Sequence, residues 1–178
     1  MPKNLVNAYR PIAIVTGPAE EIQVTPDHGE TIPAGYAATY STKATNGRSM
    51  APLVALADET AGVVFIAMEA SNKAEVAPSQ TDAIDGTTMM NIAFGAMACI
   101  QGGGGRVKVT KSLWDSDGTF AIGDHVTVTS AGKLKGVATA SLDDMWVFGT
   151  IAFVEGSTGN EIIHFNFNSN GWHAPAVS

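Results

Sequence analysis

The chain has 178 residues, and its 10 Lys and Arg against 17 Asp and Glu give a formal net charge of −7. This balance argues against a nucleic-acid-binding surface and against adhesion to anionic lipid, because both need clustered positive charge. Only 15% of the residues are charged, against roughly 25% in an average soluble domain. Two interpretations of this low charge stay open: an Ala-rich composition, or a surface that copies of the chain or a partner cover.

Cysteine usage and hydropathy narrow the class of protein further. Cys99 is the single cysteine, which excludes an intrachain disulfide and two-cysteine metal motifs, and its apolar surroundings predict a small core residue. The N-terminal residues MPKNLVNAYRP lack the apolar core of a secretion signal. The longest apolar run, residues 89–100, is shorter than the roughly 20 residues of a membrane-spanning helix. We therefore expect synthesis in a cytoplasm and no membrane partner.

Residues 1–50 differ from the rest of the chain, because five prolines and four glycines punctuate them. Each proline fixes its own φ and biases the preceding residue toward extended geometry. Short strand-like pieces lie between them, at residues 12–15 and 22–24. The pattern predicts an extended arm with a few strands over residues 1–50, poorly ordered in the free protein and ordered on a partner surface. The remaining residues, 51–178, form the predicted main domain.

Within residues 51–178, period-two patterns dominate. Residues 120–138, FAIGDHVTVTSAGKLKGVA, alternate β-branched and polar side chains on each side of a glycine turn, which predicts a β-hairpin. Further strands are predicted at residues 62–69, 90–100, 106–111, 145–154 and 161–168. For residues 90–100 a helix is the rival interpretation, which Gly95 and the glycines at 102–105 weaken. Regular strand spacing without an amphipathic helix indicates an all-β protein, a small β-barrel or sandwich.

Motifs that could carry chemistry are few. The four glycines at 102–105 lack the Lys-Ser/Thr of a phosphate-binding loop, so a flexible turn is predicted there. Asp115 and Asp117 precede Gly118, but no bidentate Glu follows at the spacing of a calcium-binding loop, which favours a solvated turn over a calcium site. The four histidines show no metal-binding spacing, and no GxSxG motif occurs. We predict no catalytic centre, no metal and no cofactor.

Three tryptophans offer a binding role instead. Trp146 lies in a doubly apolar strand and is predicted to be a core residue. Trp114, beside a turn with Asp115 and Asp117, and Trp172, in the C-terminal segment, could each be exposed. An exposed tryptophan more often marks an interface than a ligand site, although it can also stack on a sugar.

The hairpin at 120–138 and the segment VFGTIAFVEGSTGNEIIHFNF (residues 147–167) together resemble the head decoration (cement) proteins of tailed bacteriophages. In that family a GD-x-V hairpin, a G-x-A strand and a closing strand of alternating apolar residues recur. The matching positions here are Gly123, Asp124, Val126, Gly149, Ile151, Ala152, Ile163, Phe165 and Phe167. The likeness covers about the C-terminal third of the chain. In the arm it extends only to the general pattern of prolines and glycines.

The resemblance implies a non-enzymatic protein of the virion that binds the outer surface of an icosahedral capsid, often as a trimer, and stabilises it. Its partners would be the major capsid protein and further copies of the chain. The expected capsid or subunit contacts are Ile12, Ile14, Val15, Ile22, Val24, Trp114 and Trp172. Three alternatives remain open: a carbohydrate- or receptor-binding module of a viral fibre or tail, another head or tail component, and a β-barrel enzyme.

Overall fold

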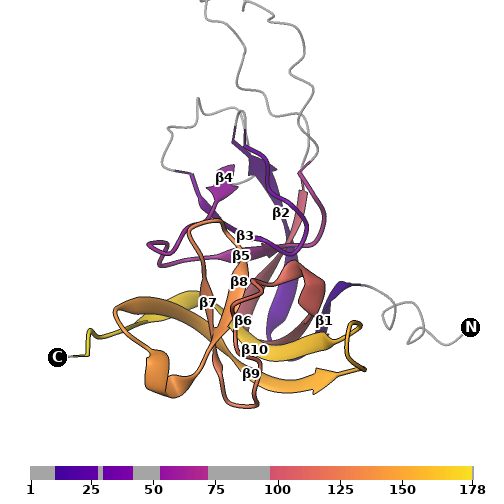
Figure 1. Cartoon of the computed structure of the whole chain (residues 1–178). Helices are drawn as coiled ribbons and strands as arrows, with labels where there is room; N and C mark the ends of the chain where they lie inside the picture. The colour runs from indigo at the N-terminus through magenta and orange to yellow at the C-terminus, as the bar shows by residue number, and fades with distance from the viewer. Residues whose placement is uncertain (1–10, 28–29, 42–52, 72–96, 178) are drawn as a thin grey trace, which may run out of the picture.

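The computed structural model describes residues 11–27, 30–41, 53–71 and 97–177, and these residues fold into ten β-strands (Figure 1). The strands are β1 (Ile12–Thr16), β2 (Ala19–Pro26), β3 (Ala37–Tyr40), β4 (Leu53–Leu56), β5 (Phe65–Ala67), β6 (Met97–Thr110), β7 (His125–Val128), β8 (Leu134–Val137), β9 (Met145–Glu155) and β10 (Ile162–Ala174). Two single 3₁₀ turns, Lys111–Leu113 and Thr139–Ser141, are the helical elements of this part of the chain. The predicted all-β class is confirmed.

The long strand β6 belongs to two sheets. Its C-terminal half lies in sheet A, where the strand order is β1-β6-β10-β9-β7-β8. Its N-terminal half lies in sheet B, where β6 pairs with β2 and β5, and the pairings β2–β4, β4–β3 and β3–β5 close a ring of five strands. In Figure 1, sheet B forms the upper part of the molecule and sheet A the lower part.

The predicted arm is corrected by the pairing of β1 and β2. These two strands follow one another along β6, antiparallel to it, from the pair Ile12–Val109 to the pair Val24–Met97. Residues 11–27 therefore belong to both sheets of their own chain and β3 belongs to sheet B, so the described residues of the predicted arm are part of the folded sheets. The prolines mislead because a proline can occupy a strand end or a bulge without breaking the sheet.

The four glycines at 102–105 lie inside β6 and not in a turn, which corrects the sequence-based prediction. They mark the point where β6 passes from sheet B to sheet A and other strands cross it closely. A Cβ atom on Gly103 would lie 2.6 Å from the carbonyl oxygen of Pro18, and one on Gly105 would lie 2.8 Å from that of Thr16. At Gly103 and Gly105 side chains are excluded because neighbouring backbone occupies their space.

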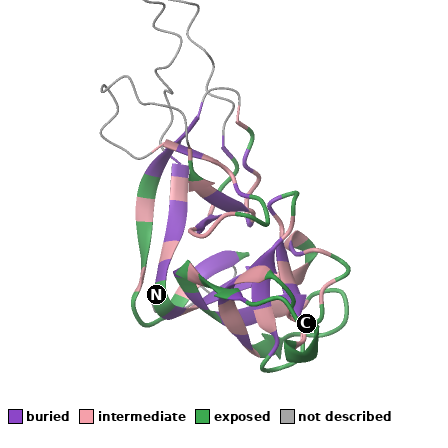
Figure 2. Ribbon diagram, turned by 90° about the vertical axis from the view of Figure 1, so that its left-hand side faces the viewer, coloured by how far each residue is buried: buried purple, intermediate pink, exposed green. Residues whose placement is uncertain are grey.

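The predicted hairpin at 120–138 is confirmed. β7 and β8 pair antiparallel from His125–Val137 to Val128–Leu134, with residues 129–133 as the turn. The predicted alternation in β10 is also confirmed, since Ile163, Phe165 and Phe167 are fully buried. Figure 2 shows such alternation of buried and exposed residues along the strands.

Two apolar clusters stabilise the fold. The larger lies against sheet A and gathers side chains from β1, β6, β7, β9 and β10, among them Ile12, Val107 and Phe165. The smaller lies inside the ring of sheet B and includes Val24 and Phe65. Because β1 and β2 contribute to one cluster each, the N-terminal strands are packed into the core at both ends of β6.

Candidate functional site

The seven predicted contact residues fall into three groups by exposure. Ile12, Val24 and Trp114 are buried in the chain itself, so they are not available to a partner in this fold. Ile14 and Ile22 are half-buried and pack against the two core clusters. Val15 and Trp172 are exposed, with 41% and 50% of their surface accessible. The structure places these last two apart, Val15 on β1 and Trp172 near the end of β10.

Trp114 is a core residue and neither an interface nor a sugar platform, which corrects the prediction. The side chain is 3% exposed. Its indole packs edge-to-face against Phe120 and Phe165, with ring centroids 5.7 and 5.2 Å away. A turn position does not itself decide exposure, because the loop after β6 folds back over sheet A and carries the ring with it. Trp146, predicted to be core, is half-buried on the periphery of the same cluster.

The outer face of sheet A carries an aromatic and charged cluster. The pairs Phe153–His164, His164–Lys108 and Lys108–Ala13 form a row across four strands, from β9 to β1. Residues directly opposite one another in neighbouring strands point to the same face of a sheet. This row is therefore one continuous strip on the side of sheet A away from the larger core cluster.

His164 is the centre of this cluster. Its ring stacks on Phe153, with centroids 4.0 Å apart, and its Nε2 lies 2.9 Å from a carboxylate oxygen of Glu155. The guanidinium carbon of Arg106 lies 5.7 Å from the centroid of the Phe153 ring. The His164 side chain is only 5% exposed. The Phe153 residue remains partly exposed, so it is a part of the cluster that reaches the surface.

The two edges of sheet A differ. At the β8 edge the backbone N–H groups of Asp115 and Thr119 donate to the carbonyl oxygens of Leu134 and Gly136, both at 2.8 Å, so a loop covers it. Within the described ranges, β1 pairs with β6 alone. A strand edge with free N–H and C=O groups is a template for pairing with another chain. Val15, at a bulge of β1, adds an exposed apolar side chain to that edge.

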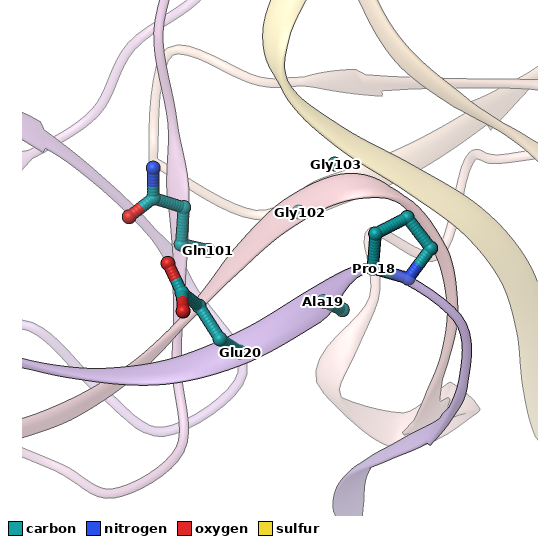
Figure 3. Close-up of a pocket in the computed structure, with 6 residues that line it drawn as sticks. All are labelled: Pro18, Ala19, Glu20, Gln101, Gly102 and Gly103. Atoms are coloured by element: carbon teal, nitrogen blue, oxygen red, sulfur yellow. The ribbon is translucent and has the colours of Figure 1, made fainter.

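A shallow hollow of about 330 Å³ lies where β2 and β6 meet (Figure 3). Its lining residues are Pro18, Ala19, Glu20, Gln101, Gly102 and Gly103. Figure 3 shows the side chains of Glu20 and Gln101 at one end and Pro18 at the other, with the glycine backbone between them. Two flexible polar side chains at a rim do not define a ligand geometry, so this hollow is a consequence of the missing side chains of the glycine run.

The Asp115–Gly118 segment is a turn, as favoured from the sequence. The backbone N–H of Asp117 donates to a carboxylate oxygen of Asp115 at 3.0 Å, and that of Gly118 to the Asp115 carbonyl oxygen at 3.3 Å. The described residues contain no cluster of three or more His, Cys, Asp or Glu side chains suited to a metal ion. In the same residues no helix has the length and apolarity to cross a membrane. The Asp115 carboxylate thus acts locally, by holding the turn.

Cys99 is a core residue, as predicted, and its chemistry follows from burial. Desolvation, and secondarily the negative charge of Glu69, raise the pKa of the thiol from 9.0 to about 12. We therefore expect no labelling of the native protein by iodoacetamide at pH 8, where about one thiol in ten thousand is ionised, and rapid labelling in urea. Fast native labelling measured by mass spectrometry would show that the ring of sheet B opens readily.

Comparison of the chain with family models, with curated proteins and with solved structures gave no match. Sequence reasoning identified Val15 and Trp172 but missed Phe153, His164 and Arg106. The available signal was the alternation of residues 162–168, which places His164 on the outward face, but nothing local indicates that Phe153 of another strand stacks on it.

Proposed function

We propose that this chain is a structural protein of a virion, a decoration protein that binds the outer surface of an icosahedral phage capsid and stabilises it. The observation that carries the proposal is the edge of β1, which within the described ranges pairs with β6 alone and bears the exposed Val15, on a sheet whose opposite edge a loop covers. Addition of a strand to such an edge gives main-chain hydrogen bonds without needing charge. This suits a chain in which only 15% of residues are charged.

The likeness to head decoration proteins in residues 120–138 and 147–167 supports the capsid as the partner. In the structure these residues form β7, β8, β9 and the first part of β10, the strands that build the half of sheet A away from β1. That half acts as the rigid frame, and the β1 edge is the side that the capsid contacts. Association into trimers, as in decoration proteins, is part of the proposal, and sedimentation equilibrium measures it directly.

The test is cosedimentation with expanded, DNA-free heads of the phage that encodes the chain. The wild-type protein is expected to bind saturably. A Val15→Lys variant should bind about tenfold more weakly or worse, because lysine on an edge strand opposes pairing with a second strand. Ile122→Lys is the matched control, since Ile122 is an exposed apolar residue, 75% accessible, in the loop before β7.

Two results would contradict the proposal in distinguishable ways. If the wild-type protein does not sediment with heads, the chain is not a decoration protein. If it binds and Val15→Lys binds equally well, capsid attachment stands but the β1 edge is not the contact.

A further inference from the structure

A second surface, independent of the β1 edge, lies where β9 and β10 separate. The two strands pair at Phe167–Gly149 and again at Trp172–Val147. Between these pairs, residues 168–171 turn away from β9 and bond to an earlier loop. The N–H of Val64 donates to the Ser169 carbonyl oxygen at 3.0 Å, and that of Gly171 to Gly62 at 3.1 Å. The separation leaves a hollow of about 200 Å³ in the sheet.

The polar lining of this hollow is regular. Asn166, Asn168, Asn170 and Trp172 alternate along β10 and are all exposed, whereas the residues between them point to the interior or the loop. Period-two alternation places all four on one face of the strand. The remaining lining residues are Gly104, Val147, Phe148, Gly149, Thr150 and Phe167. None of the ten lining residues carries a formal charge.

Local contacts orient the ends of this strip. The ring of His125 stands at 85° to the Trp172 indole, with centroids 5.9 Å apart, and so supports the indole from β7. The Asn168 side-chain oxygen accepts a hydrogen bond from the Asn170 backbone N–H at 3.1 Å, which fixes the position of the Asn168 amide. The strip therefore combines a held aromatic plane, half of it accessible, with a row of amides.

The chemistry of the strip matches an uncharged sugar. A carboxamide both donates and accepts hydrogen bonds, as each sugar hydroxyl does, and an indole offers an apolar plane for the C–H face of a pyranose ring. The volume is below the roughly 300 Å³ at which drug-sized pockets begin, which suits one ring rather than a long chain. We propose that the Asn166–Trp172 strip binds a single neutral hexopyranose unit.

The proposal is tested by two-dimensional NMR of the ¹⁵N-labelled chain, with D-glucose, D-galactose, D-mannose and N-acetyl-D-glucosamine as probes. At least one sugar should shift the Trp172 indole N–H and the side-chain amides of the strip saturably, with a Kd of roughly 0.1–10 mM. Glucuronate should bind more weakly than glucose, because the chain carries a net charge of −7 and the strip holds no cation.

Variants locate the binding. Trp172→Ala should weaken it about tenfold or more, and Asn166→Ala several-fold, with unchanged circular dichroism. Tyr40→Ala is the matched control, because Tyr40 is an aromatic residue on β3 of sheet B with an exposed fraction of 51%, close to that of Trp172. The affinity of the Tyr40→Ala variant for the sugar should equal that of the wild type.

The proposal is overturned if no probe shifts these signals up to about 50 mM, or if Trp172→Ala binds the sugar like the wild type. It is equally overturned if the chemical shifts of the strip change with the protein concentration and not with the sugar concentration, because the strip would then be a contact between copies of the chain.

Discussion

Removal of residues 1–35 is expected to abolish cooperative folding. The deletion removes β1 and β2, which pair with both halves of β6 from Ile12 to Val24. It also removes Ile12, Val24 and Ile32, which are 2% exposed or less. Burial of each large aliphatic side chain contributes about 1.5–3 kcal/mol, so roughly 5–9 kcal/mol is lost. This is comparable with the whole stability of a typical domain, about 5–15 kcal/mol.

Far-UV circular dichroism and urea titration measure this prediction. The truncated chain should show no cooperative transition, whereas the full chain should unfold in one. Two point variants of β1 serve as the internal comparison. Ile12→Ala, in the core, should lower the free energy of unfolding by about 2–5 kcal/mol. Val15→Ala, at an exposed position of the same strand, should lower it by about 0.5 kcal/mol. A truncated chain that unfolds cooperatively near the full-length midpoint would restore the dispensable arm predicted from the proline pattern.

Gly102→Ala is expected to destabilise the fold by about 3 kcal/mol through overpacking. The added Cβ would lie 2.5 Å from the carbonyl oxygen of Phe167 and would also collide with its ring. The Phe167 side chain is fully buried, and the clashing carbonyl oxygen belongs to the backbone of β10, so a change of the Phe167 rotamer alone does not relieve the contact. The Gly102 N–H also donates to the Ser169 hydroxyl at 2.9 Å, in a buried contact that a backbone shift would break.

Gly104→Ala is the comparison within the same glycine run. Its φ is +97°, and no atom lies within 4 Å of the Cβ position. The expected cost is therefore that of left-handed backbone alone, about 1–2 kcal/mol. Thermal melts should rank the variants wild type, Gly104→Ala and Gly102→Ala, the last lower than wild type by roughly 6–12 °C. A reversed rank would mean that backbone angle, and not the close crossing with β10, explains the glycine run.

Part of the candidate site was predictable because it is a property of one strand. The sequence predicts Val15 and Trp172 as contact residues because they are apolar or aromatic residues in strand-like or terminal segments, and both are exposed. The same reasoning predicts Trp114 as a contact residue, but it is buried and packs against Phe120 and Phe165. Exposure of a single side chain depends on which distant segment covers it, and neighbouring residues carry no information about that.

The sequence by itself determined the all-β class and the faces of individual strands. Alternation is local: Val107 and Val109, or Ile163 and Phe165, point inward because successive strand residues point to opposite sides. The tertiary structure alone decided the neighbours of each strand. The pairing of Ile12 with Val109 joins segments that are distant in the sequence. The stack of Phe153 on His164 and the gap between β9 and β10 depend on the register of those two strands. Register follows from the packing of the whole sheet, so no local pattern could place the β1 edge or the Asn166–Trp172 strip on the surface of the molecule.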